Sequence, residues 1–296
     1  LEVSGGNHTE HTNAALAATD ASTKNQIGET IVKINGTTAY PGGTYASGLI
    51  ATNNSTIYMI DPNNVIKTDA TNGPIYSADA IYVAGGGTVE MKGKTISIAG
   101  KNTVFGVENA GGTVIVNGLT TFSVEASDST GTGNVTGVSV TSSAGTNTLK
   151  DLNTDLVVTA NGVANGILAS AGTNNVDGVK DIVITSTGGS ASGIQGSSGG
   201  KNNINKDAQT QLGTLAVTAS GGDAYGIVAH DSGTVNTVAG LGAVTAKGVT
   251  NTDAIYANGG KNVVNHAEDT GRVDITAIST SSSADGVYAM NGGMNE

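Results

Sequence analysis

The sequence contains no cysteine and no tryptophan, and only two phenylalanines, Phe105 and Phe122. Without cysteine, the chain has neither a disulfide framework nor thiol catalysis. Without large aromatic side chains, a core must be built from Val, Ile, Leu and Ala, and the β-branched residues among these favour strands. The sequence therefore predicts a β-rich protein whose core consists of many small apolar side chains.

Charge is also scarce. Charged residues make up 12% of the 296 residues, the formal net charge is −11, and Arg272 is the single arginine. Nucleic-acid binding needs clustered positive charge that displaces counterions, so no nucleic-acid partner is expected. No apolar run reaches membrane-spanning length, so no membrane insertion by this segment is expected.

Proline is rare and unevenly placed, because Pro41, Pro62 and Pro74 all lie before residue 75. Proline cannot donate a hydrogen bond to a strand ladder, so its absence from residues 75–296 fits continuous backbone pairing. Glycine is abundant, at 45 residues, and this frequency disfavours helices.

A repeat runs through most of the chain. "SSGGKNNIN" ends at Asn205, and the similar "ANGGKNVVN" ends at Asn265. A small residue followed by a branched apolar residue recurs about every 30 residues, a period typical of stacked repeats. The nine copies are Gly48-Leu49, Ala80-Ile81, Gly106-Val107, Gly137-Val138, Gly166-Ile167, Gly193-Ile194, Gly226-Ile227, Ala254-Ile255 and Gly286-Val287.

Each repeat holds two further strand-like runs. One follows a glycine corner, as in "GTVIV" from Gly112, and the other alternates apolar residues, as at Ile182 and Ile184. Three short strands without two-residue hairpin turns indicate a coil, in which each strand pairs in parallel with its counterpart one turn away. We therefore predict an all-β fold, a right-handed single-stranded parallel β-helix (β-solenoid) of about nine rungs, or turns, of roughly 30 residues with three short strands each.

The first 45 residues depart from the repeat. "HTNAALAATDAS" suggests a short helix and "ETIVKING" a strand. Because the open edge of a solenoid invites aggregation unless it is covered, we interpret residues 1–45 as an N-terminal cap region and residues 46–296 as the β-helix repeats. The chain ends in "NGGMNE", partway through a repeat, so we expect a truncation at the C-terminus.

The phrases "GGTVIVNG", "GGKNNIN" and "SASGIQGSSGG" resemble the rungs of passenger domains of Gram-negative autotransporter (type V secreted) adhesins. The resemblance covers roughly residues 46–296 and lies in the style of the repeat. It implies a location at the bacterial cell surface or outside the cell, secretion through the outer membrane, and a C-terminal membrane barrel downstream in the full-length protein. It also implies adhesion, self-association or biofilm formation, with proteolysis or toxicity in members that carry added domains.

Asparagine recurs at the third position of the glycine-led run, at Asn147, Asn174 and Asn202. In the "GTVNT" copy, the same alignment places Val235 at the third position and Thr237 at the fifth. Stacked amides can hydrogen-bond along a solenoid axis, either as an internal ladder or as a polar ligand surface. We favour the internal ladder, because the fifth position on the same face is apolar in most copies.

Three aspartates, Asp79, Asp253 and Asp285, stand just before the first run, and the last two are expected on neighbouring rungs. Close carboxylates repel unless a cation or N–H groups compensate, so these residues either cap corners or bind calcium. The calcium-binding nonapeptide pattern is missing, with only a faint echo in "GGDAYG". Capping is therefore favoured, and no metal or other cofactor is predicted.

The outward positions of the first run form a mixed column: Tyr82, Glu108, Ser139, Leu168, Gln195, Val228, Tyr256 and Tyr288. Tyr256 and Tyr288 are expected to stack on adjacent rungs, with Tyr225 close by. Exposed aromatic residues anchor binding surfaces, but cross-strand pairing that covers the sheet is the alternative. The candidate binding residues are Tyr225, Tyr256, Tyr288, Asp253 and Asp285.

No pattern indicates catalysis. There is no G-x-S-x-G elbow, and "HTEH" at His8–His11 lacks the spacing of a zinc protease. We expect a non-catalytic surface adhesin or self-association module for cell–cell, biofilm or host-surface attachment. Its partner would be another copy of itself on a neighbouring cell, or a host surface glycan or protein. The alternative is a β-helical carbohydrate-active enzyme or a tailspike-like glycan-binding protein, which would need a cleft with two or more carboxylates across neighbouring rungs.

Overall fold

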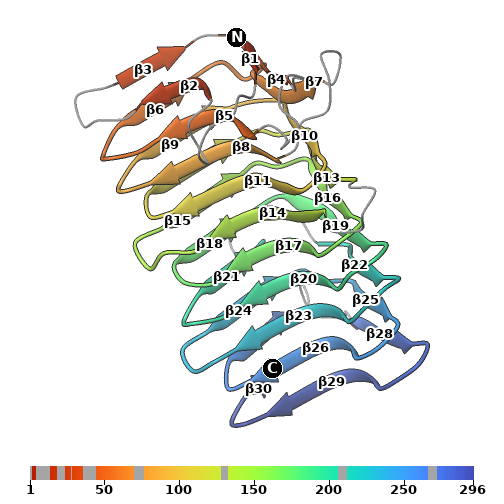
Figure 1. The fold of residues 1–296 in the computed structure, drawn as a ribbon. Coiled ribbons are helices and arrows are strands. Elements are labelled where there is room, and N and C mark those ends of the chain that lie inside the picture. Colours follow the sequence, from red (N-terminus) through yellow and green to blue (C-terminus); the bar gives the residue numbers. More distant parts are fainter. Residues whose placement is uncertain are drawn as a thin grey trace.

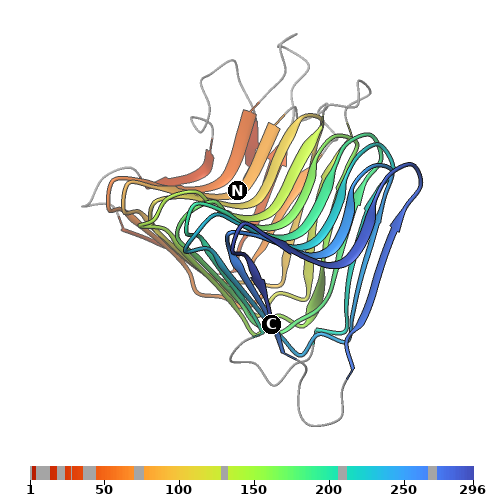
Figure 2. The ribbon, with the colours of Figure 1, turned by 90° about the horizontal axis from the view of Figure 1, so that it is seen from below.

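The computed structural model describes residues 2–4, 14–18, 24–27, 29–35, 45–69, 77–127, 133–205, 212–265 and 272–296. Its strands are parallel and form three sheets of ten strands each. The chain visits the three sheets in turn and then repeats the circuit, so it coils as a right-handed solenoid (Figures 1 and 2). The described residues include no helix long and apolar enough to cross a membrane.

We name the sheets A, B and C. Sheet A contains β1 (Glu2–Ser4), β4 (Ile31–Asn35), β7 (Val65–Asp69), β10 (Thr95–Gly100), β13 (Thr121–Ala126), β16 (Thr154–Ala160), β19 (Val179–Ser186), β22 (Thr214–Ala219), β25 (Ala243–Gly248) and β28 (Asp274–Ser279). Sheet B contains β2 (Ala14–Ala18), β5 (Tyr45–Ala51), β8 (Ser77–Ala84), β11 (Thr103–Ala110), β14 (Asn134–Val140), β17 (Ala164–Ala169), β20 (Ala191–Gly196), β23 (Ala224–His230), β26 (Thr252–Asn258) and β29 (Ala284–Met290). Sheet C contains β3 (Lys24–Ile27), β6 (Thr56–Met59), β9 (Thr88–Lys92), β12 (Thr113–Asn117), β15 (Thr146–Lys150), β18 (Thr173–Val176), β21 (Lys201–Ile204), β24 (Val235–Ala239), β27 (Lys261–Asn265) and β30 (Met294–Asn295).

The predicted fold is confirmed, because each sequence run becomes one sheet. The small-plus-branched run forms sheet B, the glycine-led run forms sheet C, and the alternating run forms sheet A. Sheet B has nine strands from residue 45 onward, from β5 to β29, and these correspond to the nine predicted rungs.

The described strands of residues 1–45 join the same three sheets. The strand predicted in "ETIVKING" is present as β4, but the helix suggested for "HTNAALAATDAS" is wrong, since Ala14–Ala18 forms β2. β2 pairs in parallel with β5, with Leu16 opposite Leu49. Alanine's helix preference is a weak local bias that sheet pairing overrides. A capping role for this segment stays a prediction.

The core consists of stacked apolar columns. On sheet A, Ile96, Phe122, Leu156 and Ile182 align on successive strands, and all four side chains are buried. Burying each such side chain contributes roughly 1.5–3 kcal/mol. The core is thus assembled from small and branched side chains, as the composition predicts.

The strands of sheet B bend, as the view along the coil illustrates (Figure 2), and a column of glycines lies within them. A Cβ on Gly106 would lie 2.5 Å from the carbonyl oxygen of Gly137 and 2.6 Å from the ring of Phe122. In the equivalent place in β26, Ala254 and the next residue, Ile255, are both buried. Two consecutive inward residues break the strand's alternation, so the residues on either side of them both face outward.

The predicted internal ladder is confirmed and is longer than expected. Each inward asparagine donates a hydrogen bond from Nδ2 to Oδ1 of the next, over 2.8–2.9 Å. The members, in order, are Asn109, Asn147, Asn174, Asn202, Asn236, Asn262 and Asn295. Asn109 lies at the end of β11 and begins the ladder, because Val114 occupies the equivalent place in β12.

In the "GTVNT" copy, the predicted alignment is wrong by one residue. Asn236, rather than Val235, pairs with Asn202, and Val238, rather than Thr237, pairs with Ile204. A shift of one residue moves every side chain of a strand to the other face. The observed register keeps the ladder continuous and places an apolar residue in the core.

The ladder also ties sheet C to sheet B. A ladder asparagine donates its second amide hydrogen to a backbone oxygen of the outward column, over 2.7–3.0 Å. The acceptors are Ser139, Leu168, Gln195, Val228, Tyr256 and Tyr288. Buried amides that are fully hydrogen-bonded in this way hold the corner between the two sheets rigidly.

Candidate functional site

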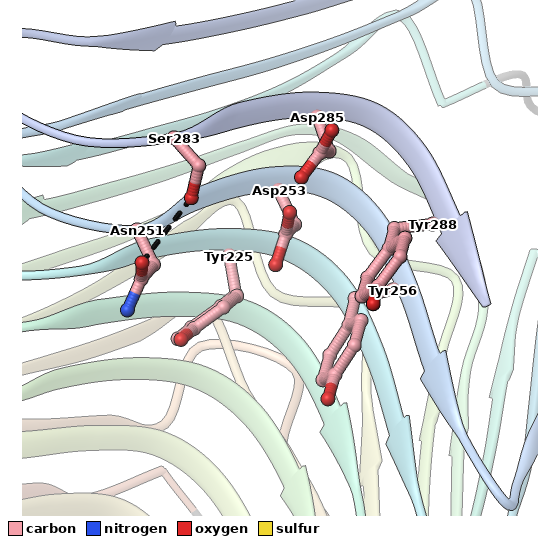
Figure 3. A pocket seen from close by; sticks show the side chains of 7 residues that line it. All are labelled: Tyr225, Asn251, Asp253, Tyr256, Ser283, Asp285 and Tyr288. Carbon is pink, nitrogen blue, oxygen red and sulfur yellow. Dashed lines mark hydrogen bonds between the residues drawn. The ribbon is translucent and has the colours of Figure 1, made fainter. Parts of the chain in front are cut away.

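The five candidate binding residues converge on the outer face of sheet B. Tyr225 lies on β23, Asp253 and Tyr256 on β26, and Asp285 and Tyr288 on β29. The register places Tyr225, Asp253 and Asp285 in one column, and Tyr256 and Tyr288 in the next outward column. Figure 3 shows the two columns facing a shared space.

The bend of sheet B creates this space. It is a pocket of about 270 Å³, lined by Tyr225, Asn251, Asp253, Tyr256, Ser283, Asp285 and Tyr288. Ser283 Oγ donates to Asn251 Oδ1 over 3.2 Å, and these two residues complete one wall (Figure 3). The sequence predictions did not include either residue. A usable signal was their shared position two residues before Asp253 and Asp285.

The tyrosines stack on one another. The Tyr256 ring centroid lies 6.1 Å from that of Tyr225, with an interplanar angle of 27°, and 5.7 Å from that of Tyr288, with an angle of 7°. The ring of His230 meets Tyr256 edge-on at 5.6 Å. β23 and β29 flank β26, so Tyr256 contacts a tyrosine on each neighbouring strand. This is the cross-strand pairing that the sequence offered as the alternative to a binding surface. Tyr288 remains 43% exposed.

Asp253 is buried without a partner. Its residue exposure is 8%, and within the described residues its carboxylate makes no hydrogen bond. Burial, followed by the negative charges of Asp285 and Asp223, raises the pKa of Asp253 from 3.8 to about 6. A carboxylate in a pocket whose pKa is raised in this way is a candidate for function.

Asp223 is satisfied, in contrast to Asp253. Its carboxylate accepts hydrogen bonds from Thr250 Oγ1, from the backbone N of Asn251 at 2.9 Å and from the Tyr225 hydroxyl at 3.3 Å. Burial, followed by the charges of Asp223 and Asp253, raises the pKa of Tyr225 to about 12. The Tyr225 hydroxyl therefore stays protonated, and Asp223 holds the loop that leads into β26.

The capping interpretation is wrong for Asp253, because it lies within β26 and accepts no hydrogen bond from a described residue. Asp79 is buried in β8, far along sheet B from Asp253, and accepts from Ser47 Oγ at 3.0 Å. Among the residues that the structure describes, no cluster of three or more His, Cys, Asp or Glu residues could hold a metal ion. His8, His11 and His266 lie outside the described residues.

Comparisons with protein-family models, with curated proteins and with solved structures found no match to this chain. The chemistry of the pocket is set by the residues that line it. Its described lining supplies two carboxylates, three phenol groups, an amide and a hydroxyl, and it supplies no cationic side chain. Such a lining suits a ligand that brings hydrogen-bond donors or positive charge.

Proposed function

We propose that this chain is a non-catalytic attachment module of a bacterial surface protein, similar to the passenger domain of an autotransporter adhesin. It acts at the cell surface, where a rigid solenoid presents repeated polar groups to another copy of itself or to a host glycan or protein. The parallel β-solenoid architecture supports this proposal, because stacked rungs repeat any outward side chain at a constant spacing.

The observation that carries the proposal is a threonine column on the outer face of sheet C. Five threonines are aligned on five successive strands, and all are half-buried. They are Thr56, Thr88, Thr113, Thr146 and Thr173. Parallel strands lie about 4.8 Å apart, so the hydroxyls form an evenly spaced array of donors and acceptors.

An array of this kind binds through many weak contacts. One hydroxyl contributes little, but contacts on a rigid scaffold add, because the second and later contacts are intramolecular. A regular partner, such as a second solenoid or a polymeric glycan, would engage several threonines at once. The proposed activity is therefore avidity-based attachment.

The test replaces Thr113, Thr146 and Thr173 together with valine, which keeps the side-chain shape and removes the hydroxyls. Bacteria that display this variant should sediment and attach less than bacteria that display the unchanged chain. Unchanged attachment by a well-folded variant would contradict the proposal.

A matched control lies on sheet A, where three other half-buried threonines are aligned on successive strands. They are Thr159, Thr185 and Thr218. The triple valine variant of this set changes the same chemistry on another face, and it should leave attachment unchanged.

A second candidate function is a carbohydrate-active enzyme, and one specific observation favours it. Asp253 and Asp285 are carboxylates on neighbouring strands, and both line one pocket. Most glycosidases use two carboxylates, one of which has a raised pKa and acts as the acid, and the pKa of Asp253 is raised to about 6. Incubation with glycan oligosaccharides, followed by analysis of the products, tests this function, and the Asp285→Asn variant is the negative control.

A further inference from the structure

We propose that the pocket between the two outward columns of sheet B binds an amino sugar, with the ammonium group of the ligand held between Asp253 and Asp285. This proposal rests on the proposed attachment function, because it names the ligand that one pocket of the attachment module would bind. It does not depend on the threonine column, which lies on another sheet.

Two carboxylates from neighbouring strands meet in the pocket. Asp253 is almost fully buried, makes no hydrogen bond to a described residue and faces the pocket, and Asp285 is its neighbour on the next strand (Figure 3). No cationic side chain is among the described residues that line the pocket. A bound cationic group would compensate the two carboxylates, and an ammonium provides three donors for them.

The residues around the two carboxylates determine which kind of molecule can bring the ammonium group into the pocket. Asn251, Ser283 and the tyrosine hydroxyls present polar atoms around the two carboxylates. An alkylammonium such as a lysine side chain brings no hydroxyls to these groups, so it makes fewer hydrogen bonds in the pocket than an amino sugar does. A sugar ring surrounds its amino group with hydroxyls, so it satisfies the walls as well as the carboxylates.

The aromatic residues and the size of the pocket agree with a sugar. The partly exposed Tyr288 has one face against Tyr256, and its remaining exposed surface can contact the apolar face of a sugar ring. The pocket volume of about 270 Å³ is slightly below the range of drug-sized sites. A site of this size suits about one sugar ring rather than a long chain.

A metal ion fits less well. Calcium takes six to eight oxygen ligands, and the described residues contain no cluster of three or more metal-binding side chains. One of the remaining oxygens, Asn251 Oδ1, already accepts a hydrogen bond from Ser283.

Calorimetric titration of the whole chain at pH 7 tests the proposal with three probes. These are a glucosamine tetrasaccharide, the N-acetylated tetrasaccharide, which has the same backbone without the charge, and n-butylamine, which has the charge without the sugar. We expect the glucosamine oligomer to bind at least about tenfold more tightly than either of the others. Equal binding of the acetylated oligomer or of butylamine, or no binding of the glucosamine oligomer at millimolar concentration, would overturn the proposal.

Two variants locate the binding. Asp253→Asn keeps the shape of the side chain and should weaken binding of the glucosamine oligomer at least about tenfold, the equivalent of one charge-assisted hydrogen bond. Asp155→Asn makes the same change at an exposed position on sheet A and should leave binding unchanged. If Asp253→Asn folds and binds normally, the site is refuted. The attachment assay with the threonine variants is separate, so failure of one proposal does not imply failure of the other.

Discussion

Asn262 donates a hydrogen bond from Nδ2 to the backbone oxygen of Tyr256 over 2.7 Å, so an internal amide of sheet C holds an outward tyrosine of sheet B in place. The same Nδ2 also donates to Asn295 Oδ1 at 2.9 Å. The ladder inside the solenoid and the pocket on its surface therefore share one framework. A change in the ladder should alter both stability and the outer face.

The ladder should be sensitive to removal of a single amide. In Asn202→Ala, the amide of Asn174 loses its acceptor, and the backbone oxygen of Gln195 loses its donor. We expect a loss of about 3 kcal/mol in the free energy of unfolding, because buried polar groups are left unpaired. Denaturant unfolding followed by circular dichroism measures this loss.

The control is the neighbouring Asn203→Ala. Asn203 bonds to Asn175 at 2.8 Å, but it does so on the outer face, where water can replace the lost contact. Its effect should stay within about 0.5 kcal/mol, as is usual for surface positions. Equal losses from both variants would show that the inward position has no special energetic role.

At Gly137, the close approach of the next strand should reject a Cβ, although the same column accommodates Ala254 in β26. In Gly137→Ala, the new atom would lie 2.6 Å from the carbonyl oxygen of Gly166, so the strand must shift. We expect a loss of about 1–3 kcal/mol, the usual cost of overpacking. Gly286→Ala lies in the same column but on β29, the last strand of sheet B, so its Cβ would meet only the Ile275 side chain at 3.6 Å and the change should be nearly neutral. Thermal melts of the two variants measure the difference. If Gly137→Ala is as stable as Gly286→Ala, the expected clash with the next strand is refuted.

Asp253 should make stability depend on pH in a definite direction. Its pKa is about 6 in the folded protein and 3.8 when unperturbed, so the folded state binds more protons between these values. The contribution of this group is therefore fully favourable below about pH 4 and is lost as the pH rises through about 6. The shift corresponds to at most about 3 kcal/mol, and solvent at the pocket mouth reduces this value.

Asp253→Asn removes this titration. Stability measured from pH 4 to pH 7.5 should fall more for the unchanged chain than for the variant, and the variant should be the more stable of the two at neutral pH. Parallel pH profiles for the two proteins would contradict the raised pKa.

The tyrosine stack should contribute a measurable coupling. Tyr256 and Tyr288 are nearly parallel, with centroids 5.7 Å apart. A double-mutant cycle with Tyr256→Ala and Tyr288→Ala should give a coupling free energy of about 0.5–1.5 kcal/mol beyond the separate losses. Additive losses would indicate that the rings are merely adjacent.

Two local predictions were wrong for the same reason. The alanine-rich segment at Ala14–Ala18 has a local preference for helix, and "GTVNT" aligns by its glycine with the other copies. The observed strand at the first and the one-residue shift at the second follow from pairing with the adjacent rung. Alignment by the glycine alone does not decide which register keeps the core apolar and the ladder continuous.

By itself, the sequence determined the coil: the period of about 30 residues, the three strands in each rung, the apolar columns and the inward asparagines are all readable from regular recurrence. The tertiary structure decided what lies outside. Parallel stacking aligns Tyr225, Asp253 and Asp285 from three successive rungs, and the bend brings a second column to face them. Whether Asp253 finds a hydrogen-bond donor depends on side chains from other rungs, and no repeat pattern encodes that contact. The candidate residues were therefore predictable, but the pocket, its walls and its unpaired carboxylate were not.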